Sequence, residues 1–287
     1  MTDTLQRFIF KDTCVRGEII RLDQTLKTIL QQNNFTLEIC DLLSQTLSAA
    51  ALLSATLKYD GELTMQFQGN DGPLKMLVAK CDNQYRIRGT AQWDTESLPG
   101  TIKTNFEKGQ LIITIKKNKT NQQYQSIVDI NHQSISQSLE NYFMQSEQLE
   151  TRLWLAYDNQ TQTAVGLLLQ KLPTEIQETE DTDNQNQWQH IQTLANTITN
   201  QELLSWPTET LLNNLFHEET IQLFEPHPVE FYCPCGADKM LNAITVLGES
   251  EALEMLSSNQ LIKVTCEYCN NHFEFNADEI KRLFIKH

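Results

Sequence analysis

The sequence predicts an α+β protein in three parts. An N-terminal domain over residues 1–173 would pack helices on a largely antiparallel sheet, residues 174–228 would form a helical linker, and residues 229–287 would form a small C-terminal domain. Three observations lead to this prediction: strand-like segments fill the first part, the composition turns acidic after Leu172-Pro173, and two cysteine pairs lie near the end. A chain of 287 residues is long enough for two domains, one with a substantial core.

The first segment of the chain favours a strand pair followed by helices. Apolar runs at Phe8–Phe10 and Val15–Leu22 indicate two strands, and Thr25–Gln32 indicates a short helix. Thr36 can cap a longer helix, because the apolar residues after it return at helical spacing and many of their neighbours are small. We expect this helix to pack under the sheet and to end at Asp60-Gly61, with the glycine in a left-handed conformation.

A series of strands follows. Leu63, Met65 and Phe67 alternate with polar residues, which is the period of a half-buried strand, and the cluster Asn70–Pro73 indicates a turn. Further strands are predicted at Leu74–Lys80, Tyr85–Gln92, Leu111–Lys116, Tyr124–Asp129, Arg152–Tyr157 and Val165–Gln170, with a helix at Ser134–Leu149. An antiparallel meander is the expected arrangement.

This first domain carries no catalytic motif. It has no G-x-S-x-G, no P-loop and no G-x-G-x-x-G. Cys14, Cys40 and Cys81 are scattered without partner spacing, and we expect them to be ordinary buried or half-buried thiols. The sequence therefore predicts a protein that is not an enzyme and uses no ATP.

The linker is marked by composition. TEIQETEDTDNQNQ holds five acids and no base, which is typical of a domain boundary. Residues 187–224 then place apolar residues such as Trp188, Ile191 and Leu194 at helical spacing on a background of Thr, Asn and Gln. Because these polar residues are poor helix formers, the helices should be marginal alone and persist only while docked on the sheet domain.

Four cysteines near the C-terminus carry the strongest signal in the chain. Cys233 and Cys235 are separated by one residue, Cys266 and Cys269 by two, and thirty residues lie between the pairs. Two such pairs complete the closed tetrahedral shell that structural Zn²⁺ prefers, and they leave no open position for a catalytic water. We therefore predict one structural or regulatory Zn²⁺ per chain.

The residues around these cysteines predict a small domain that needs its metal. Asp238–Leu247 and Glu249–Leu256 indicate two helices broken at Gly248, and Ile262–Thr265 with His272–Phe275 indicates a hairpin. A domain of this size has a small core, and structural zinc contributes about 10 to 16 kcal/mol of apparent binding energy in small fingers, nearly all of it folding energy. Loss of the metal should unfold it.

Two other arrangements of the cysteines stay open at this point. His272 or His227 could replace one sulfur in a mixed site, and permanent disulfides could form in a secreted protein. Met1 to Phe10 contains acidic Asp3 and no uninterrupted apolar region, so we expect no secretory leader. No run is expected to reach the roughly 18 apolar residues of a membrane span. A cytoplasmic protein without membrane contact is the prediction.

Three functions fit a four-cysteine zinc site. A constitutive zinc-ribbon adaptor for nucleic acid or the ribosome is one, but the net charge is -15 and residues 229–287 hold five bases against nine acids. A purely structural knuckle is the second. The third is a redox switch, because metal-bound thiolates are the nucleophilic form, and oxidation to disulfides removes the charge that holds the ion. Zinc release and local unfolding would then occur together.

The whole chain resembles the redox-regulated thirty-three-kilodalton heat-shock chaperone family, bacterial holdases activated by oxidative stress. The segments that carry the resemblance are VRGEIIRLDQT, LSAAALLSATLKYDGELTMQFQGNDGPL, the linker, and the C-terminal CPC and CEYC. The chain departs from many members at Gly236–Met240, which lacks an arginine, and in a linker rich in Gln and Asn.

The resemblance implies a function and the roles of particular residues. Cys233, Cys235, Cys266 and Cys269 would bind Zn²⁺ in an inactive reduced monomer. Oxidation would join Cys233 to Cys235 and Cys266 to Cys269, release zinc and unfold the linker. The active form would be a homodimer that binds unfolded client proteins and prevents their aggregation without ATP.

Overall fold

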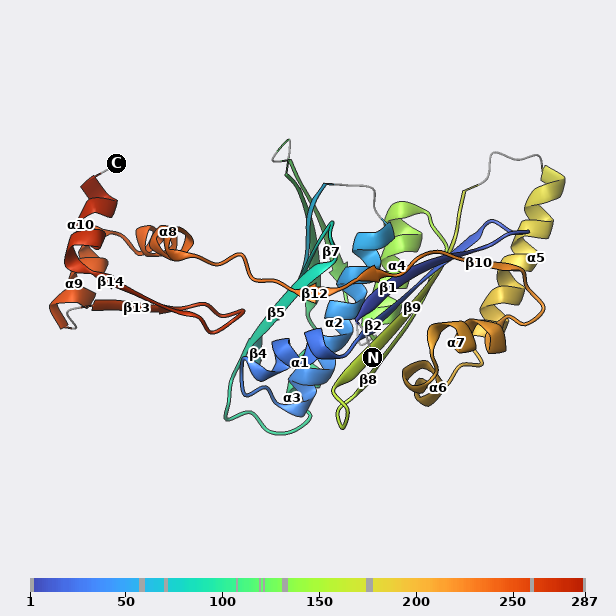
Figure 1. The fold of residues 1–287 in the computed structure, drawn as a ribbon, viewed down its shortest axis with the longest axis horizontal. Helices are drawn as coiled ribbons and strands as arrows, with labels where there is room; N and C mark the ends of the chain where they lie inside the picture. Colours follow the sequence, from blue (N-terminus) through green and yellow to red (C-terminus); the bar gives the residue numbers. More distant parts are fainter. Residues whose placement is uncertain are drawn as a thin grey trace. The chain divides into compact units, whose positions relative to one another are not determined.

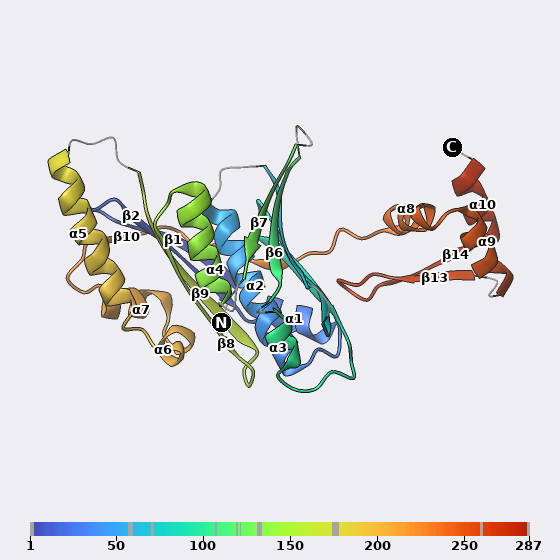
Figure 2. The same cartoon turned by 180° about the vertical axis from the view of Figure 1, so that it is seen from behind.

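The computed structural model describes residues 3–56, 60–69, 72–106, 108–118, 120, 122–130, 134–173, 178–258 and 261–285. The chain divides into two compact units, Met1–Phe231 and Tyr232–His287. Both contain helices and sheet, so the predicted α+β class is confirmed (Figures 1 and 2). Residues 70 and 71 of the predicted turn, and residues 174–177 of the acidic segment, lie outside the described residues.

One sheet of the N-terminal unit has the order β10-β1-β2-β9-β8, and β11 also pairs with β1. All its pairs are antiparallel. Its strands are β1 Thr4–Phe10, β2 Val15–Leu22, β8 Thr151–Asp158, β9 Thr163–Lys171, β10 Ile221–Leu223 and β11 His227–Pro228. The two short strands come from the predicted linker and have too few residues to show a pattern in the sequence.

The second sheet has the order β12-β5-β4-β3-β6-β7. Its strands are β3 Gly61–Gln68, β4 Leu74–Asp82, β5 Arg86–Trp93, β6 Gln110–Lys117, β7 Gln123–Asp129 and β12 Glu230–Phe231. The pairs from β5 to β7 are antiparallel, as predicted, whereas β12 joins β5 in parallel. The alternation predicted at Leu63, Met65 and Phe67 is confirmed, because these three side chains are fully buried in β3.

The prediction for Gly61 was wrong. Gly61 begins β3 and is not among the residues with positive φ, so it is not a left-handed helix cap. A side chain there would meet the backbone of the neighbouring strand, because a Cβ would lie 2.0 Å from the carbonyl oxygen of Lys116. Close strand approach, and not helix termination, requires the glycine.

The long predicted helix is α2, Leu37–Thr56, and it packs against strands of both sheets (Figure 1). Thr36 accepts a hydrogen bond from the backbone N–H of Ile39, as expected of a cap. Small residues on α2, such as Ala49, Ala50 and Ala51, are fully buried and allow the sheets to approach. Contrary to the sequence prediction, α2 reaches the length and hydropathy of a membrane span, but 83% of that window is buried in this core.

The other helices of this core are α1 Gln24–Gln31, α3 Thr101–Phe106 and α4 Ile135–Tyr142. The sequence prediction missed α3, and it extended the helix at Ser134–Leu149 too far as a single α-helix. Ser134 caps α4 with a capping box, and the chain continues as a π-helix, η1 Phe143–Glu147. Gln148 ends it in the left-handed conformation, with φ 55°.

The described part of the linker contains α5 Glu178–Ala195, α6 Asn200–Ser205 and α7 Thr208–Leu215. These helices lie on the face of the first sheet opposite to α2 in both views (Figures 1 and 2). There they share one apolar cluster with the sheet, to which Trp188, Ile191 and Leu211 contribute from the helices and Phe8 and Leu167 from the strands. The predicted docking of the linker on the sheet domain is confirmed.

The C-terminal unit contains α8 Ala237–Leu247, α9 Glu249–Ser258, a hairpin of β13 Leu261–Thr265 and β14 His272–Asn276, and α10 Ala277–Ile285. The break at Gly248, with φ 93°, and the hairpin are confirmed, and α10 was missed. Its buried apolar cluster consists of Ile244, Ala252, Ile262, Phe275 and Ile280. Such a small core is expected to need further stabilisation.

Candidate metal centre

Two local structures present the four cysteines of the C-terminal unit to one another. Cys233 and Cys235 lie in the extended segment before α8, whose N-cap is Gly236. Cys266 and Cys269 lie in the turn between β13 and β14. That turn is closed by two backbone hydrogen bonds, from Asn270 N–H to the Cys266 oxygen at 2.8 Å and from Cys266 N–H to the Asn271 oxygen at 2.9 Å.

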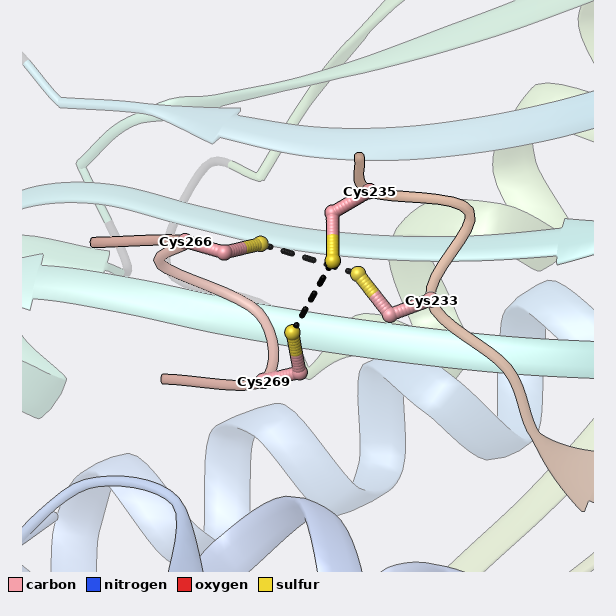
Figure 3. A group of neighbouring side chains, drawn as sticks. All are labelled: Cys233, Cys235, Cys266 and Cys269. Atoms are coloured by element: carbon pink, nitrogen blue, oxygen red, sulfur yellow. Dashed lines mark hydrogen bonds between the residues drawn. The ribbon is translucent and has the colours of Figure 1, made fainter. Parts of the chain in front are cut away.

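The four sulfur atoms converge on one point (Figure 3). All lie within 4.8 Å of one another, with Cys233 Sγ 3.6 Å from Cys266 Sγ and Cys235 Sγ 3.3 Å from Cys269 Sγ. Sulfurs at the corners of a tetrahedron with metal–sulfur bonds of about 2.3 Å would lie about 3.8 Å apart. The donor set therefore fits a metal ion. Both of these contacts join the two pairs, so proximity alone does not select which sulfurs would form disulfides.

The protonation of these thiols depends on their surroundings. Burial raises the pKa of Cys233, and it raises the pKa of Cys269 to about 11. Burial also opposes ionisation of Cys266, but hydrogen bonds to its sulfur, led by the backbone N–H of Tyr268, bring its pKa below the usual value. Four thiolates so close together would repel one another, so a cation is needed to hold all four in the ionised form.

The two histidines considered as alternative ligands are engaged elsewhere. The metal-capable group in the described residues contains the four cysteines and no histidine. His272 Nδ1 lies 2.8 Å from Thr265 Oγ1 within the hairpin, and the His227 ring packs on Tyr85 in the N-terminal unit with centroids 5.4 Å apart. The mixed site weighed from the sequence is therefore not the arrangement in this structure.

Comparison with known families and structures identifies the type of protein. The family model described as Hsp33 protein matches residues 3–276. This chain belongs to the Hsp33 family. The resemblance found in the sequence is thereby confirmed.

Curated Hsp33 relatives match this chain over nearly their whole length. The 33 kDa chaperonin of Nitrosococcus oceani is 39% identical over 99% of this chain and 95% of its own, and that of Ectopseudomonas mendocina is 38% identical over 99% and 96%. The crystal structure of an Hsp33 homologue from Thermotoga maritima has a TM-score of 0.80 at 21% identity, covering 99% of this chain and 98% of its own. That likeness supports the fold.

The sequence analysis missed two asparagines that shape this Hsp33 centre. Asn270 takes the left-handed conformation, with φ 53°, which lets the chain turn back after Cys269. The side chain of Asn271 donates to Cys235 Sγ at 3.9 Å and so links the two cysteine segments. Two asparagines directly after the second pair were the available signal, because Asn tolerates this conformation better than most residues.

The remaining cysteines of this Hsp33 chain belong to the N-terminal unit. Cys40 and Cys81 are buried in the N-terminal unit, and Cys14 is half-buried there. Burial raises the pKa of Cys40, and it raises the pKa of Cys81 to about 12. Cys40 and Cys81 are therefore buried thiols, as the sequence predicted for them.

Proposed function

We propose that this chain is a cytoplasmic, redox-regulated chaperone that binds unfolding proteins without ATP and prevents their aggregation under oxidative stress. In the reduced state it would bind one Zn²⁺ and be inactive. Oxidation would form two disulfides, release the zinc and unfold the linker over residues 174–228. The active form would be a homodimer that needs neither nucleic acid nor membrane and catalyses no reaction.

The observation that carries this proposal is the convergence of four sulfurs in a unit with very little apolar core. All four lie within 4.8 Å of one another, whereas the buried apolar cluster in the described part of that unit has five members. A closed shell of four thiolates favours Zn²⁺, which would neutralise the sulfurs and supply folding energy to the unit. The metal and the fold of residues 232–287 would therefore be lost together.

Oxidation removes electrons from the cysteine sulfurs, and hydrogen peroxide accepts these electrons. Two thiolates give one disulfide and two electrons, and one hydrogen peroxide takes up those electrons with two protons to give two waters. Oxidation of all four cysteines consumes two peroxide molecules. By the family resemblance, the bonds formed are Cys233–Cys235 and Cys266–Cys269.

The path from the metal centre to the linker is short. Phe231 ends β12, and Cys233 follows two residues later. Before β12, Val229 is buried in the main core, and the Thr25 hydroxyl donates to its carbonyl oxygen at 3.1 Å. The segment 229–231 therefore connects the linker directly to the C-terminal unit. Unfolding of the C-terminal unit would leave this segment without a folded domain after it and, with mild heat, free the linker. Release would uncover the apolar face of the first sheet for clients.

The test compares aggregation of a thermally unfolding client in the presence of reduced protein and of protein treated with peroxide and mild heat. We expect suppression only after treatment. Bound zinc and free thiols should fall from one ion and seven thiols to no ion and three, because the chain has seven cysteines. Equal suppression in both states would rule out the switch, and nucleic-acid binding without suppression would favour the adaptor.

A further inference from the structure

The sequence removes one backbone hydrogen-bond donor at the join between α6 and α7. In a continuing helix the carbonyl of Leu203 would accept from the N–H of residue 207, but this residue is Pro207, which has no N–H. The chain leaves the helix at Trp206, with φ -81° and ψ 137°. Carbonyl groups at this end of α6 therefore need a donor from elsewhere.

Arg21 of β2 supplies that donor from the sheet beneath. One terminal nitrogen donates to the Leu203 oxygen at 3.4 Å and also to the Trp206 oxygen, and the other donates to the Leu204 oxygen at 3.5 Å. Its Nε donates to the Thr208 hydroxyl at 3.3 Å. One guanidinium group thus contacts both helices and the join between them.

The charge of Arg21 is compensated by this backbone. The residue is only 7% exposed, and burial alone lowers its pKa, to about 10, with no contribution from a nearby carboxylate. It therefore remains a cation at neutral pH. Carbonyl groups at a helix C-terminus carry partial negative charge and favour a cation there. When the helices leave, water can solvate both the guanidinium and the carbonyl groups, but the charge-assisted hydrogen bonds between them exist only in the docked state.

The polar contacts between α5 and the sheet domain are of a different kind. Trp188 Nε1 donates to Glu150 at 2.8 Å, and Lys171 donates to Gln185 at 2.5 Å, so each joins one linker side chain to one side chain of the sheet domain. Either contact can be lost without leaving a buried backbone group unpaired. Arg21 instead satisfies several backbone carbonyls at once.

We propose that Arg21 is a latch that holds the α6–α7 join on the sheet and so sets how readily the linker is released. This inference rests on the proposed function for its effect on chaperone activity. Whether or not the chain is a chaperone, the latch would control the local opening of residues 200–215. It predicts that loss of the guanidinium opens this segment while the two sheets stay folded.

The experiment measures amide hydrogen exchange in the full-length reduced protein and in Arg21→Met, Arg21→Lys and Arg16→Met variants. Arg16 is the matched control, because it lies on the same strand but donates to Gln170 at 2.6 Å and to the Thr56 oxygen of α2 at 3.4 Å. The reporters are the N–H groups of Trp206 and Leu211, which donate to the oxygens of Glu202 and Pro207.

In Arg21→Met the reporter amides should exchange at least about tenfold faster, the change expected when a hydrogen bond to a charged group is lost. Amides of the β1–β2 ladder should be unchanged. Arg21→Lys should lie between this variant and the parent, because an ammonium group cannot reproduce the planar fork. Arg16→Met should leave the reporters unchanged. Unchanged exchange at the reporters in Arg21→Met, or equal acceleration in Arg16→Met, would overturn the latch.

Chaperone activity then separates the two proposals. If the parent suppresses aggregation only when oxidised, Arg21→Met should reach half-maximal activity at a lower peroxide dose than Arg16→Met, and an equal dose for the two would overturn the role of the latch in activation. If the parent suppresses aggregation in neither state, the proposed function fails, while the exchange rates still decide whether Arg21 holds the linker.

Discussion

Besides Arg21, the packing of α5 on the first sheet should contribute to the free energy that is needed to release the linker. Ile191 is 1% exposed and belongs to the apolar cluster that joins the linker helices to the sheet. Replacement of a buried isoleucine by alanine costs about 2–5 kcal/mol, because it removes apolar burial and leaves a cavity. The released linker exposes the side chain in both proteins, so nearly all of this cost falls on the docked state.

The expected size of the effect follows directly. A cost of about 3 kcal/mol multiplies the population of released linker by roughly 150, since each 1.4 kcal/mol is a factor of ten. Ile191→Val should cost only about 0.5–1.5 kcal/mol and raise that population roughly two- to tenfold. The two variants form a graded series at one position.

Tryptophan emission and activation by peroxide measure this series. Trp188 is fully buried and Trp206 half-buried in the same interface, so release should shift the emission to the red. Ile191→Ala should need the least peroxide and the lowest temperature, Ile191→Val should be intermediate, and Thr193→Ala should match the parent. Thr193 is exposed on the same helix, and alanine is the better helix former, so this control separates packing from helix propensity. If Ile191→Ala stays folded yet activates like Thr193→Ala, α5 packing does not restrain the linker.

Three further predictions concern the thiols and the metal. Chelation under reducing conditions should abolish amide protection in the β13–β14 hairpin and leave the two sheets of the N-terminal unit protected; a hairpin still protected in the metal-free protein would contradict the dependence of that unit on its ion. Iodoacetamide at pH 8 should leave Cys81 unmodified in the native protein, because a pKa of about 12 leaves a thiolate fraction of only about 10⁻⁴; mass analysis would detect early labelling if this were wrong. During oxidation, time-resolved thiol trapping should find the Cys266–Cys269 bond before the Cys233–Cys235 bond, because two cysteines that flank one proline have little freedom to approach, and the reverse order would refute this reasoning.

The four cysteines of the candidate metal centre could be predicted from the sequence alone, because the spacing of both cysteine pairs is local. Residues one or two apart can direct their sulfurs to one ion whatever the surrounding fold, and the hairpin signals at Ile262–Thr265 and His272–Phe275 already placed the second pair in a turn. The contributions of Asn270 and Asn271 could not be assigned, because an asparagine gains its role only when the chain around it adopts a particular turn.

Strong periodicity also determined most of the fold. The strands with alternating burial and the long helix α2 were predicted because each buries apolar side chains. Such side chains recur in the sequence at the spacing of a strand or a helix. Gly61 was misjudged because the same residue type serves a helix end and a close strand contact, and only the position of Lys116 on the paired strand distinguishes them. The short strands β10, β11 and β12 were missed because each exists through its partner, β1 or β5, and not through its own two or three residues.

The sequence by itself indicated that this Hsp33 chain has a sheet domain, a helical segment with an apolar face after it, and a group of four cysteines. Only the tertiary structure decided how the linker is held. The helical pattern at Trp188 and Ile191 predicted docking on the sheet domain, but it did not show which of the two sheets the apolar face would contact. Nor could it reveal that Arg21 donates to carbonyls more than 180 positions away, because hydrogen bonds between distant segments leave no period in the sequence and arise only when folding brings the donor and acceptor together.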